Sequence, residues 1–348
     1  MKKNKKTLTT AEHFKKISEE NIDFNLMKAE EVEKRLHALY NGAISQINKR
    51  IDDVFYSYIR KFDLTKKQGF DLLNQPLSYF EREELLKDIA KIKNPTVRKR
   101  FLARLDKDAY LYRMNREELL KEHTRAIINQ VAVEEELMGV ALFTSTLPET
   151  YFKTVHIIQS FTEYKIIKDN KTHLVKKLTS KTWNGGNYSS RVWKNADILT
   201  QQLNDQIKAG ILAGTDNRKL ARMLKDNCDA GLYGARRLVR TEMSYLTNEA
   251  QLEAYKEEGV EKYVFLATLD LRTSKKCASL DLKKFKITEK EVGVNFPPMH
   301  PLCRSTVYPD IKKRKTNMSI RRAKDKLGNT IVVDGIMNYE QWRKKFID

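Results

Sequence analysis

The sequence predicts an α+β protein that is mostly α-helical, with a long helical amino-terminal region followed by a compact module of helices and a small sheet. Apolar residues recur at steps of three and four over much of the chain before Gly259, which is the spacing of amphipathic helices. Asn and Gly cluster at 184–187, which indicates a turn or hinge, and after Gly259 the pattern becomes that of short strands. The predicted order along the chain is a basic, partner-docking helical domain (1–183), a linker (184–192), a compact module (193–310) and a basic tail (311–348).

The amino-terminal region is expected to consist of long helices. The apolar stripe from Leu36 to Phe62 predicts the first, and residues Ser78–Ile92 predict a second. Asn94-Pro95-Thr96 introduces a third, capped by Asn94 or Thr96. We expect its helical pattern to continue through Met138 and to end at Pro148.

Further helices are expected after the turn at 184–187. An apolar stripe from Ala196 to Ile211 predicts one, and Thr215-Asp216 has the character of a cap for another. Gly231 and Gly234 then precede a longer helix, which we expect to end at Glu258-Gly259 with a glycine C-cap.

Short strands are expected near the end of the module. Lys262–Thr268 is rich in residues that favour strands, Lys284–Ile287 is a candidate partner for it, and Thr306–Tyr308 is a candidate third strand. The first of these strands would bring Asp270 and Arg272 to the mouth of the loop that follows.

That loop carries the residues with the most distinctive chemistry in the chain. Cys277, His300 and Cys303 lie within one short segment, and thiolate and imidazole are the protein groups that suit a zinc-like ion. Asp270, Asp281 or a water could complete a tetrahedral set, and the spacing does not choose among them. The alternative is that both cysteines are small buried apolar residues and that His300 donates to a carbonyl.

A triplet within the predicted long helix, Arg240-Thr241-Glu242, has two interpretations. It could be catalytic, but Arg and Glu on helices usually form surface ion pairs, and no nucleophile or base stands beside them in the sequence. We therefore expect a structural role.

The order of the Arg240-Thr241-Glu242 triplet, the strand before Asp270 and the segment with Cys277, His300 and Cys303 resembles the Mu F-like minor head proteins of tailed phages. These are also called phage head morphogenesis proteins. The resemblance covers roughly 193–310, and its specific signal is the combination of His-Pro-x-Cys-Arg at residues 300–304 with Asp-x-Arg-Thr at residues 270–273. Many relatives have Cys-x-x-Cys where this chain has Ser274 and Cys277, and serine is a poor zinc ligand. The motif residues beside Cys277, His300 and Cys303 are Arg240, Thr241, Glu242, Asp270, Arg272, Asp281, Pro298, Pro301 and Arg304.

The resemblance implies a virion protein of low copy number that acts in head assembly or in DNA ejection. It would contact the portal, scaffold or major capsid protein, lie in the capsid interior or at the portal vertex, and pass through the host cytoplasm during assembly. The family has no established reaction, so we expect no enzymatic activity, no catalytic residue and no cofactor other than a possible zinc ion.

Composition and charge are consistent with such a setting. The 348 residues carry a net charge of +20, which favours a polyanionic neighbour such as DNA without implying sequence recognition. A solvated basic face, or one that docks on an acidic protein, is the alternative. No apolar run approaches the ~20 residues of a membrane helix, and three cysteines argue against a disulfide scaffold. The candidate DNA contacts in the tail are Lys312, Lys313, Arg314, Lys315, Arg321 and Arg322.

Two enzymatic alternatives remain open at the level of sequence. A metal-dependent nuclease would use clustered carboxylates and an imidazole, for which Asp270, Asp281, Glu242 and His300 are the candidates. The only sequence feature that suggests a toxin-like, ADP-ribosylating domain is Arg240-Thr241-Glu242.

Overall fold

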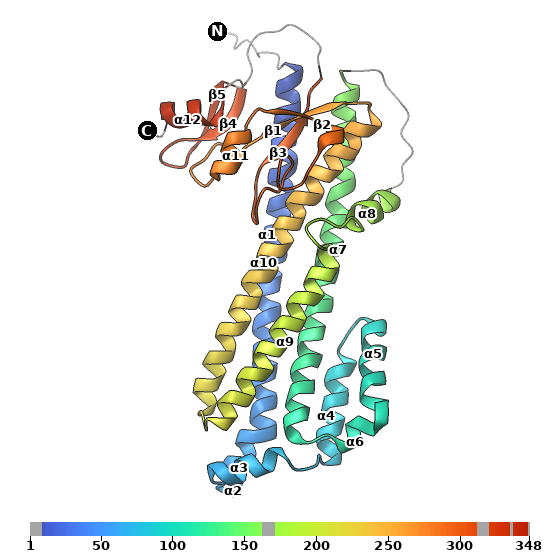
Figure 1. The fold of residues 1–348 in the computed structure, drawn as a ribbon, viewed down its shortest axis with the longest axis vertical. Coiled ribbons are helices and arrows are strands. Elements are labelled where there is room, and N and C mark those ends of the chain that lie inside the picture. Colours follow the sequence, from blue (N-terminus) through green and yellow to red (C-terminus); the bar gives the residue numbers. More distant parts are fainter. Residues whose placement is uncertain (1–8, 162–170, 312–319, 335–336, 347–348) are drawn as a thin grey trace, which may run out of the picture. The chain divides into compact units, whose positions relative to one another are not determined.

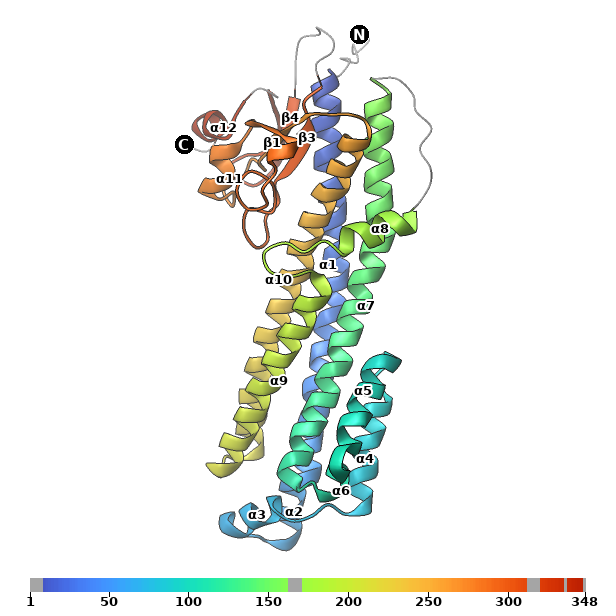
Figure 2. The same cartoon turned by 45° about the vertical axis from the view of Figure 1, so that its right-hand side comes forward.

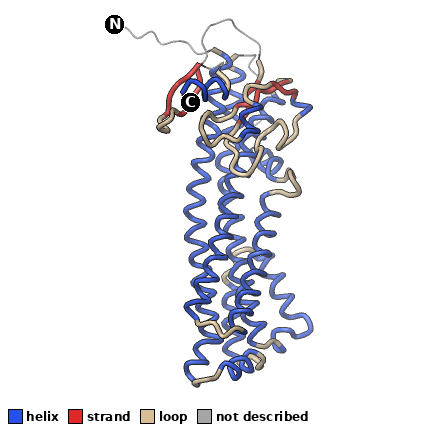
Figure 3. The backbone as a smooth tube through the Cα atoms, turned by 60° about the vertical axis from the view of Figure 1, so that its left-hand side comes forward, coloured by secondary structure: helices blue, strands red, loops and turns tan. Residues whose placement is uncertain are grey.

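The computed structural model describes residues 9–161, 171–311, 320–334 and 337–346. Most of these residues are helical, and the strands are short and confined to the carboxyl-terminal part, as the blue and red segments of Figure 3 show. The predicted fold class, α+β and mostly α, is therefore confirmed. Within the described ranges, no helix combines the length and the apolar character needed to cross a bilayer.

The chain divides into two compact units. One, which we call the sheet unit, comprises Met1–Glu31, Ala141–Asn187 and Arg237–Asp348, and the other, the helical unit, comprises Val32–Val140 and Tyr188–Arg236. Their segments alternate along the chain, whereas the domain boundaries that we predicted divide it consecutively. Three long helices each contribute to both units, namely α1 (Thr10–Ile51), α7 (Arg116–Gln159) and α10 (Asn217–Glu257) (Figure 1).

The shorter helices of the helical unit begin where their sequences supply caps. Ser78 and Glu81 form a capping box, and the side chain of Asn94 accepts hydrogen bonds from the N–H groups of Thr96 and Val97. Asn94 is thus the cap of the third predicted helix. The elements are η1 (Asp52–Tyr56), α2 (Ser57–Phe62), α3 (Lys66–Leu73), α4 (Tyr79–Ala90), α5 (Pro95–Asp106), η2 (Lys107–Ala109), α6 (Tyr110–Arg113) and α9 (Tyr188–Leu212).

Two predicted helix boundaries before residue 160 are wrong. The helix expected from Thr96 through Met138 is interrupted, because Asp108 and Ala109 take left-handed backbone conformations between α5 and α6. The expected stop at Pro148 is also wrong, since α7 continues through it to Gln159. Leu147 is fully buried and Thr144 is exposed, so packing favours the helix while solvent can reach the carbonyl that proline leaves unpaired.

The two helices predicted around Gly231 and Gly234 form one helix. The carboxylate of Asp216 accepts hydrogen bonds from the N–H groups of Arg218 and Lys219, as expected of a cap, but α10 then runs unbroken to Glu257. A Cβ at Gly231 would lie 2.9 Å from the Leu199 side chain, so glycine here permits close helix packing and does not end the helix. The predicted end is confirmed, with Gly259 at a φ of 72°.

The sheet unit contains the predicted antiparallel sheet, in the order β2-β1-β3. Tyr263 of β1 pairs with Phe285 of β2 and with Pro309 of β3. In Figure 2, β1 and β3 lie beside the last turns of α10, and the buried side chains of Leu252 and Tyr255 pack on this sheet. The strands and short elements are β1 (Lys262–Leu266), α11 (Lys275–Leu280), β2 (Lys284–Lys286), η3 (Ile287–Glu289), β3 (Thr306–Pro309) and α8 (Lys171–Thr179).

The described part of the tail is ordered against the module. A hairpin of β4 (Ile320–Lys324) and β5 (Thr330–Asp334) precedes α12 (Tyr339–Phe346). Trp342 is fully buried, packs in one core cluster with Leu269, and donates its indole N–H to the Lys324 carbonyl at 3.0 Å. Of the candidate DNA contacts, Lys312, Lys313, Arg314 and Lys315 lie outside the described residues, and for Arg321 and Arg322 of β4 only the backbone is described.

The packing of Gly139 yields a test of the helical unit. A Cβ at Gly139 of α7 would overlap the ring of Tyr188, which is buried and donates its hydroxyl to the Glu135 carbonyl at 2.9 Å. Gly139→Ala should therefore destabilise the protein by about 1–3 kcal/mol, although alanine is the better helix former. The control is Gly42→Ala in α1, where a Cβ meets nothing within 4 Å and stability should rise by up to about 1 kcal/mol. Urea unfolding measures both, and a stabilised Gly139→Ala variant would contradict the packing.

Candidate functional site

The first part of the site is the short helix after β1. The Ser274 hydroxyl caps α11 by accepting a hydrogen bond from the Cys277 N–H at 3.2 Å. This cap starts the helix where the chain leaves the sheet and fixes the position of Cys277 in its first turn. Cys277 is buried with Phe265 and Met299 in a small apolar cluster.

The second part is the irregular segment that contains His300 and Cys303. The Cys303 N–H donates to the His300 carbonyl at 3.2 Å, and Leu302 between them has a φ of 62°. The His300 Nδ1 lies 2.9 Å from the Pro301 carbonyl oxygen. Because a carbonyl can only accept, Nδ1 carries the proton of the neutral ring, and the lone pair belongs to Nε2.

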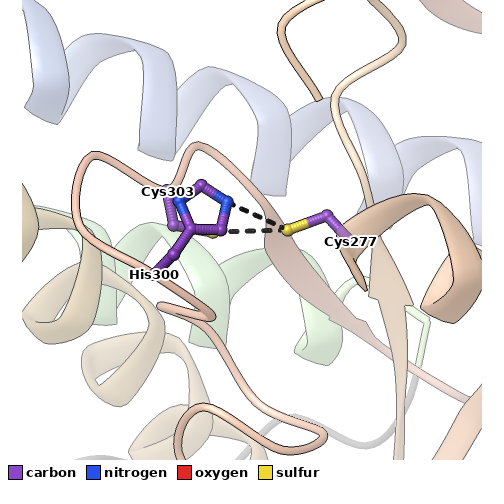
Figure 4. Close-up of side chains that lie close together, drawn as sticks. All are labelled: Cys277, His300 and Cys303. Atoms are coloured by element: carbon purple, nitrogen blue, oxygen red, sulfur yellow. Dashed lines mark hydrogen bonds between the residues drawn. The ribbon is translucent and has the colours of Figure 1, made fainter. Parts of the chain in front are cut away.

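These two parts bring the three predicted ligands together. The Cys277 Sγ lies 3.5 Å from the His300 Nε2 and 3.8 Å from the Cys303 Sγ (Figure 4). All three ligand atoms lie within 4.8 Å of one another, and both cysteines are buried and free of disulfides. No other group of three or more His, Cys, Asp or Glu side chains in the described part of the chain is arranged to hold a metal ion.

The two sulfurs have different proton affinities. A hydrogen bond from the Cys303 thiol lowers the pKa of Cys277 despite burial, with help from the hydroxyls of Ser274 and Ser305 and from the nearby His300. The same hydrogen bond and burial raise the pKa of Cys303. Cys277 is therefore the thiol of the pair that ionises first.

Asp270 does not belong to this cluster, which corrects its assignment as a possible metal ligand. Its carboxylate accepts two hydrogen bonds from the Arg304 guanidinium and one from the Arg272 N–H. Burial alone would raise the pKa of Asp270, but the hydrogen bonds and charge of Arg304 outweigh burial and lower it. The oxygens that a metal would need are thus committed to an ion pair that joins the turn after β1 to the start of β3. The exposed side chain of Arg272 lies at the edge of this pair.

Asp281 and Glu242 are also engaged elsewhere. Asp281 follows α11 and accepts a hydrogen bond from the Ala267 N–H at 2.9 Å, which ties the end of α11 to the end of β1. Glu242 is buried and accepts from the Trp183 indole at 3.1 Å. The carboxylates proposed for a nuclease therefore serve separate structural contacts.

Thr241 of the Arg240-Thr241-Glu242 triplet holds the segment that carries His300 and Cys303. The Thr241 hydroxyl accepts from the Leu302 N–H at 3.1 Å and donates to the Arg237 carbonyl at 2.6 Å. Arg240 pairs with Glu30 at 2.9 Å. Sequence reasoning foresaw a structural role for the triplet but missed this contact with the His300–Cys303 turn.

It also missed a row of buried polar side chains on α10. Gln251 donates to the Thr306 hydroxyl at 3.0 Å, that hydroxyl donates to Asn248 at 3.0 Å, and Tyr255 donates to the Val307 carbonyl at 3.0 Å. The sequence pattern that could have predicted this row is the recurrence of polar residues at every third or fourth position along α10.

The match to a known family covers the elements just described. Residues 201–308 match the family Phage Mu protein F like protein. The chain therefore contains a Mu F-like domain. The matched segment runs from α9 to β3, contains Cys277, His300 and Cys303, and lies within the range 193–310 expected from the resemblance.

A curated relative shares part of this chain. This chain is 30% identical over 140 residues to a protein of Enterococcus faecalis (strain ATCC 700802 / V583) named NAD(+)–arginine ADP-ribosyltransferase EFV. The alignment covers 39% of this chain and 29% of that relative, so the chain spans less than a third of the relative's length. No solved structure matches the chain.

The ion pair of Asp270 predicts a dependence of stability on pH. Asp270→Asn should lower the free energy of unfolding by about 2 kcal/mol near pH 7, because it removes one charge of a largely buried, doubly hydrogen-bonded pair. Asp270 has a lowered pKa in the fold, so its contribution is present above the unfolded value of about 3.9 and is lost as the pH falls through the folded value.

The difference between Asp270→Asn and the wild type should therefore shrink below about pH 4. Urea unfolding between pH 7 and pH 3 measures it. Asp229→Asn is the control, since its pair with Lys225 is exposed and should contribute little to stability. An unchanged difference across this pH range would contradict the role given to the Asp270 carboxylate.

Proposed function

We propose that this chain is a minor head protein of a tailed phage or prophage, present at few copies in the virion and acting in head assembly or DNA ejection. The observation that carries the proposal is the match of residues 201–308 to the Mu F-like family. The matched module contains helices and a small sheet joined by hydrogen bonds from α10, which suits a structural component.

The proposal includes a position close to packaged DNA. The net charge of +20 favours a phosphate-rich neighbour. The surplus of positive charge is spread along the chain and has a local peak after Asp310, where eleven Lys or Arg face four Asp or Glu. Charge alone gives affinity without sequence preference, so the expected contact with DNA is non-specific and salt-dependent.

Protein partners within the head are also part of the proposal. Large aromatic side chains of the helical unit are exposed, among them Tyr79, Phe80 and Tyr112 at 75%, 69% and 65%. Aromatic groups on a surface favour burial against another protein. The partners that fit the proposed role are the portal, scaffold or major capsid proteins.

The nuclease alternative has less support from the geometry than the structural role. Metal-dependent cleavage needs clustered carboxylates, yet Asp270 pairs with Arg304, Asp281 accepts from the Ala267 N–H, and Glu242 accepts from Trp183.

The relative's name favours a second candidate, ADP-ribosyl transfer. Against it, most of that relative's length lies outside the aligned part, and Glu242 of this chain is buried and hydrogen-bonded. We therefore propose a protein without enzymatic activity.

Mass spectrometry of purified particles tests the virion role. Density-purified virions of the phage that encodes this chain should retain it at a few copies relative to the major capsid protein, because head proteins are assembled before DNA is packaged. Abundant host cytosolic proteins in the same preparation give the level of contamination. Depletion of the chain to that level would contradict the proposal.

Enzyme assays separate the proposal from its alternatives. The purified full-length chain should neither nick supercoiled DNA with Mg²⁺ or Mn²⁺ nor transfer ADP-ribose from labelled NAD⁺ to arginine. Cleavage that Asp270→Asn abolishes would establish the nuclease, and transfer that Glu242→Gln abolishes would establish the transferase.

A further inference from the structure

We propose that Cys277, His300 and Cys303 bind one Zn²⁺ ion through two sulfurs and one imidazole nitrogen, and that a water molecule takes the fourth position. This inference concerns the folded chain by itself and does not depend on the proposed role in the phage head.

The distances between the ligand atoms fit a tetrahedral zinc ion. Zn–S bonds of about 2.3 Å and Zn–N bonds of about 2.05 Å at tetrahedral angles place two sulfurs about 3.8 Å apart and a sulfur and a nitrogen about 3.6 Å apart. The chain has 3.8 Å between the Cys277 and Cys303 sulfurs and 3.5 Å between the Cys277 Sγ and the His300 Nε2. For the remaining pair, His300 and Cys303, the ligand atoms lie within 4.8 Å of each other.

The orientation of His300 supports the same conclusion. Its Nδ1–H donates to the Pro301 carbonyl, which leaves the Nε2 lone pair directed at the cluster. Metal-binding histidines usually have their second ring nitrogen held in this way by a carbonyl or carboxylate, because the contact fixes both the tautomer and the ring plane. A histidine that served only to cap a turn would not need a sulfur 3.5 Å from its other nitrogen.

The fourth position falls to solvent because the nearby protein oxygens are occupied. Asp270 is bound by Arg304, and Asp281 accepts from the Ala267 N–H. The Ser274 hydroxyl accepts from the Cys277 N–H, and a neutral hydroxyl is a poor zinc ligand. His300 is only half-buried, so water can approach from its side.

Zinc at this position would fasten α11 to the irregular segment that returns to β3. The two cysteines are 26 residues apart, and the segment that carries His300 and Cys303 is otherwise held to α10 through Thr241. Because the ion binds the native state with three ordered ligands, it should add to the free energy of unfolding.

Metal content and stability test the proposal on the full-length chain. Protein purified under reducing conditions and then freed of metal should take up about one Zn²⁺ per chain, as determined by elemental analysis, and its melting temperature should rise. Cys277→Ser, Cys303→Ser and His300→Ala should each bind zinc at least tenfold more weakly and lose the thermal shift. Cys228→Ser is the matched control, since this buried cysteine belongs to the helical unit and lies outside the cluster, and it should bind zinc with the same affinity and thermal shift as the wild type.

Cobalt substitution provides a readout that does not depend on how the variants fold. The wild-type chain titrated with Co²⁺ should develop the absorption of tetrahedral cobalt with sulfur-to-metal charge transfer, and Zn²⁺ should remove that absorption. Ser274→Cys places a further thiol near Cys277 and should bind the ion more tightly.

Two results would overturn the proposal. One is a wild-type chain that is folded by circular dichroism and reduced, with all three cysteines titratable, yet takes up no Zn²⁺ or Co²⁺. The other is equal metal uptake by the wild type and by a folded variant lacking both Cys277 and Cys303.

Discussion

The sheet unit depends on one constraint, which is the line of hydrogen bonds that holds residues 302–307 along the buried face of α10. The Thr241 hydroxyl accepts from the Leu302 N–H, Gln251 donates to the Thr306 hydroxyl, and Tyr255 donates to the Val307 carbonyl. Gln251, Thr306, Tyr255 and Val307 are buried, so leaving one of their hydrogen-bonding groups unpaired would cost roughly 1–3 kcal/mol. The observed placement of the returning chain pairs these groups.

That placement determines the rest of the site. It fixes the register of β3 against β1, with Val307 opposite Phe265, and it presents Arg304 to Asp270. It also fixes Cys303, which has its N–H on the His300 carbonyl, at the position where α11 brings Cys277. The cluster of sulfur and imidazole is therefore a consequence of how the chain returns along α10, and a bound ion would reinforce a geometry that the hydrogen bonds already favour.

The sequence was sufficient where a local interaction decides the structure. Asn94 and Asp216 act as caps, Gly259 ends α10, and the change to a strand pattern gives β1. It was insufficient where packing overrides a local preference. Pro148 does not stop α7 because Leu147 and its neighbours are buried, and Gly231 does not break α10 because the missing side chain lets another helix approach.

The same distinction applies to the candidate site. Residue type alone identified Cys277, His300 and Cys303, since few side chains suit a thiophilic metal and these lie close in the sequence. Asp270 was assigned to the metal because nothing in the sequence reveals that Arg304, 34 residues later, supplies its partner. The polar face of α10 was missed because the partners of its buried polar residues lie on a strand, and the sequence does not show which strand packs there.

The hydrogen-bond partners of the carboxylates bear on the function of the matched module. A catalytic carboxylate has to reach its substrate, and a metal-binding one has to keep an oxygen free. In the matched module, Asp270, Asp281 and Glu242 each direct their oxygens to an internal donor, on Arg304, Ala267 and Trp183 respectively. These three acidic residues thus stabilise the fold. The remaining distinctive chemistry is the cluster of two sulfurs and an imidazole, whose geometry suits holding α11 and the His300–Cys303 segment together. This distribution of roles fits the structural role that we propose for the chain.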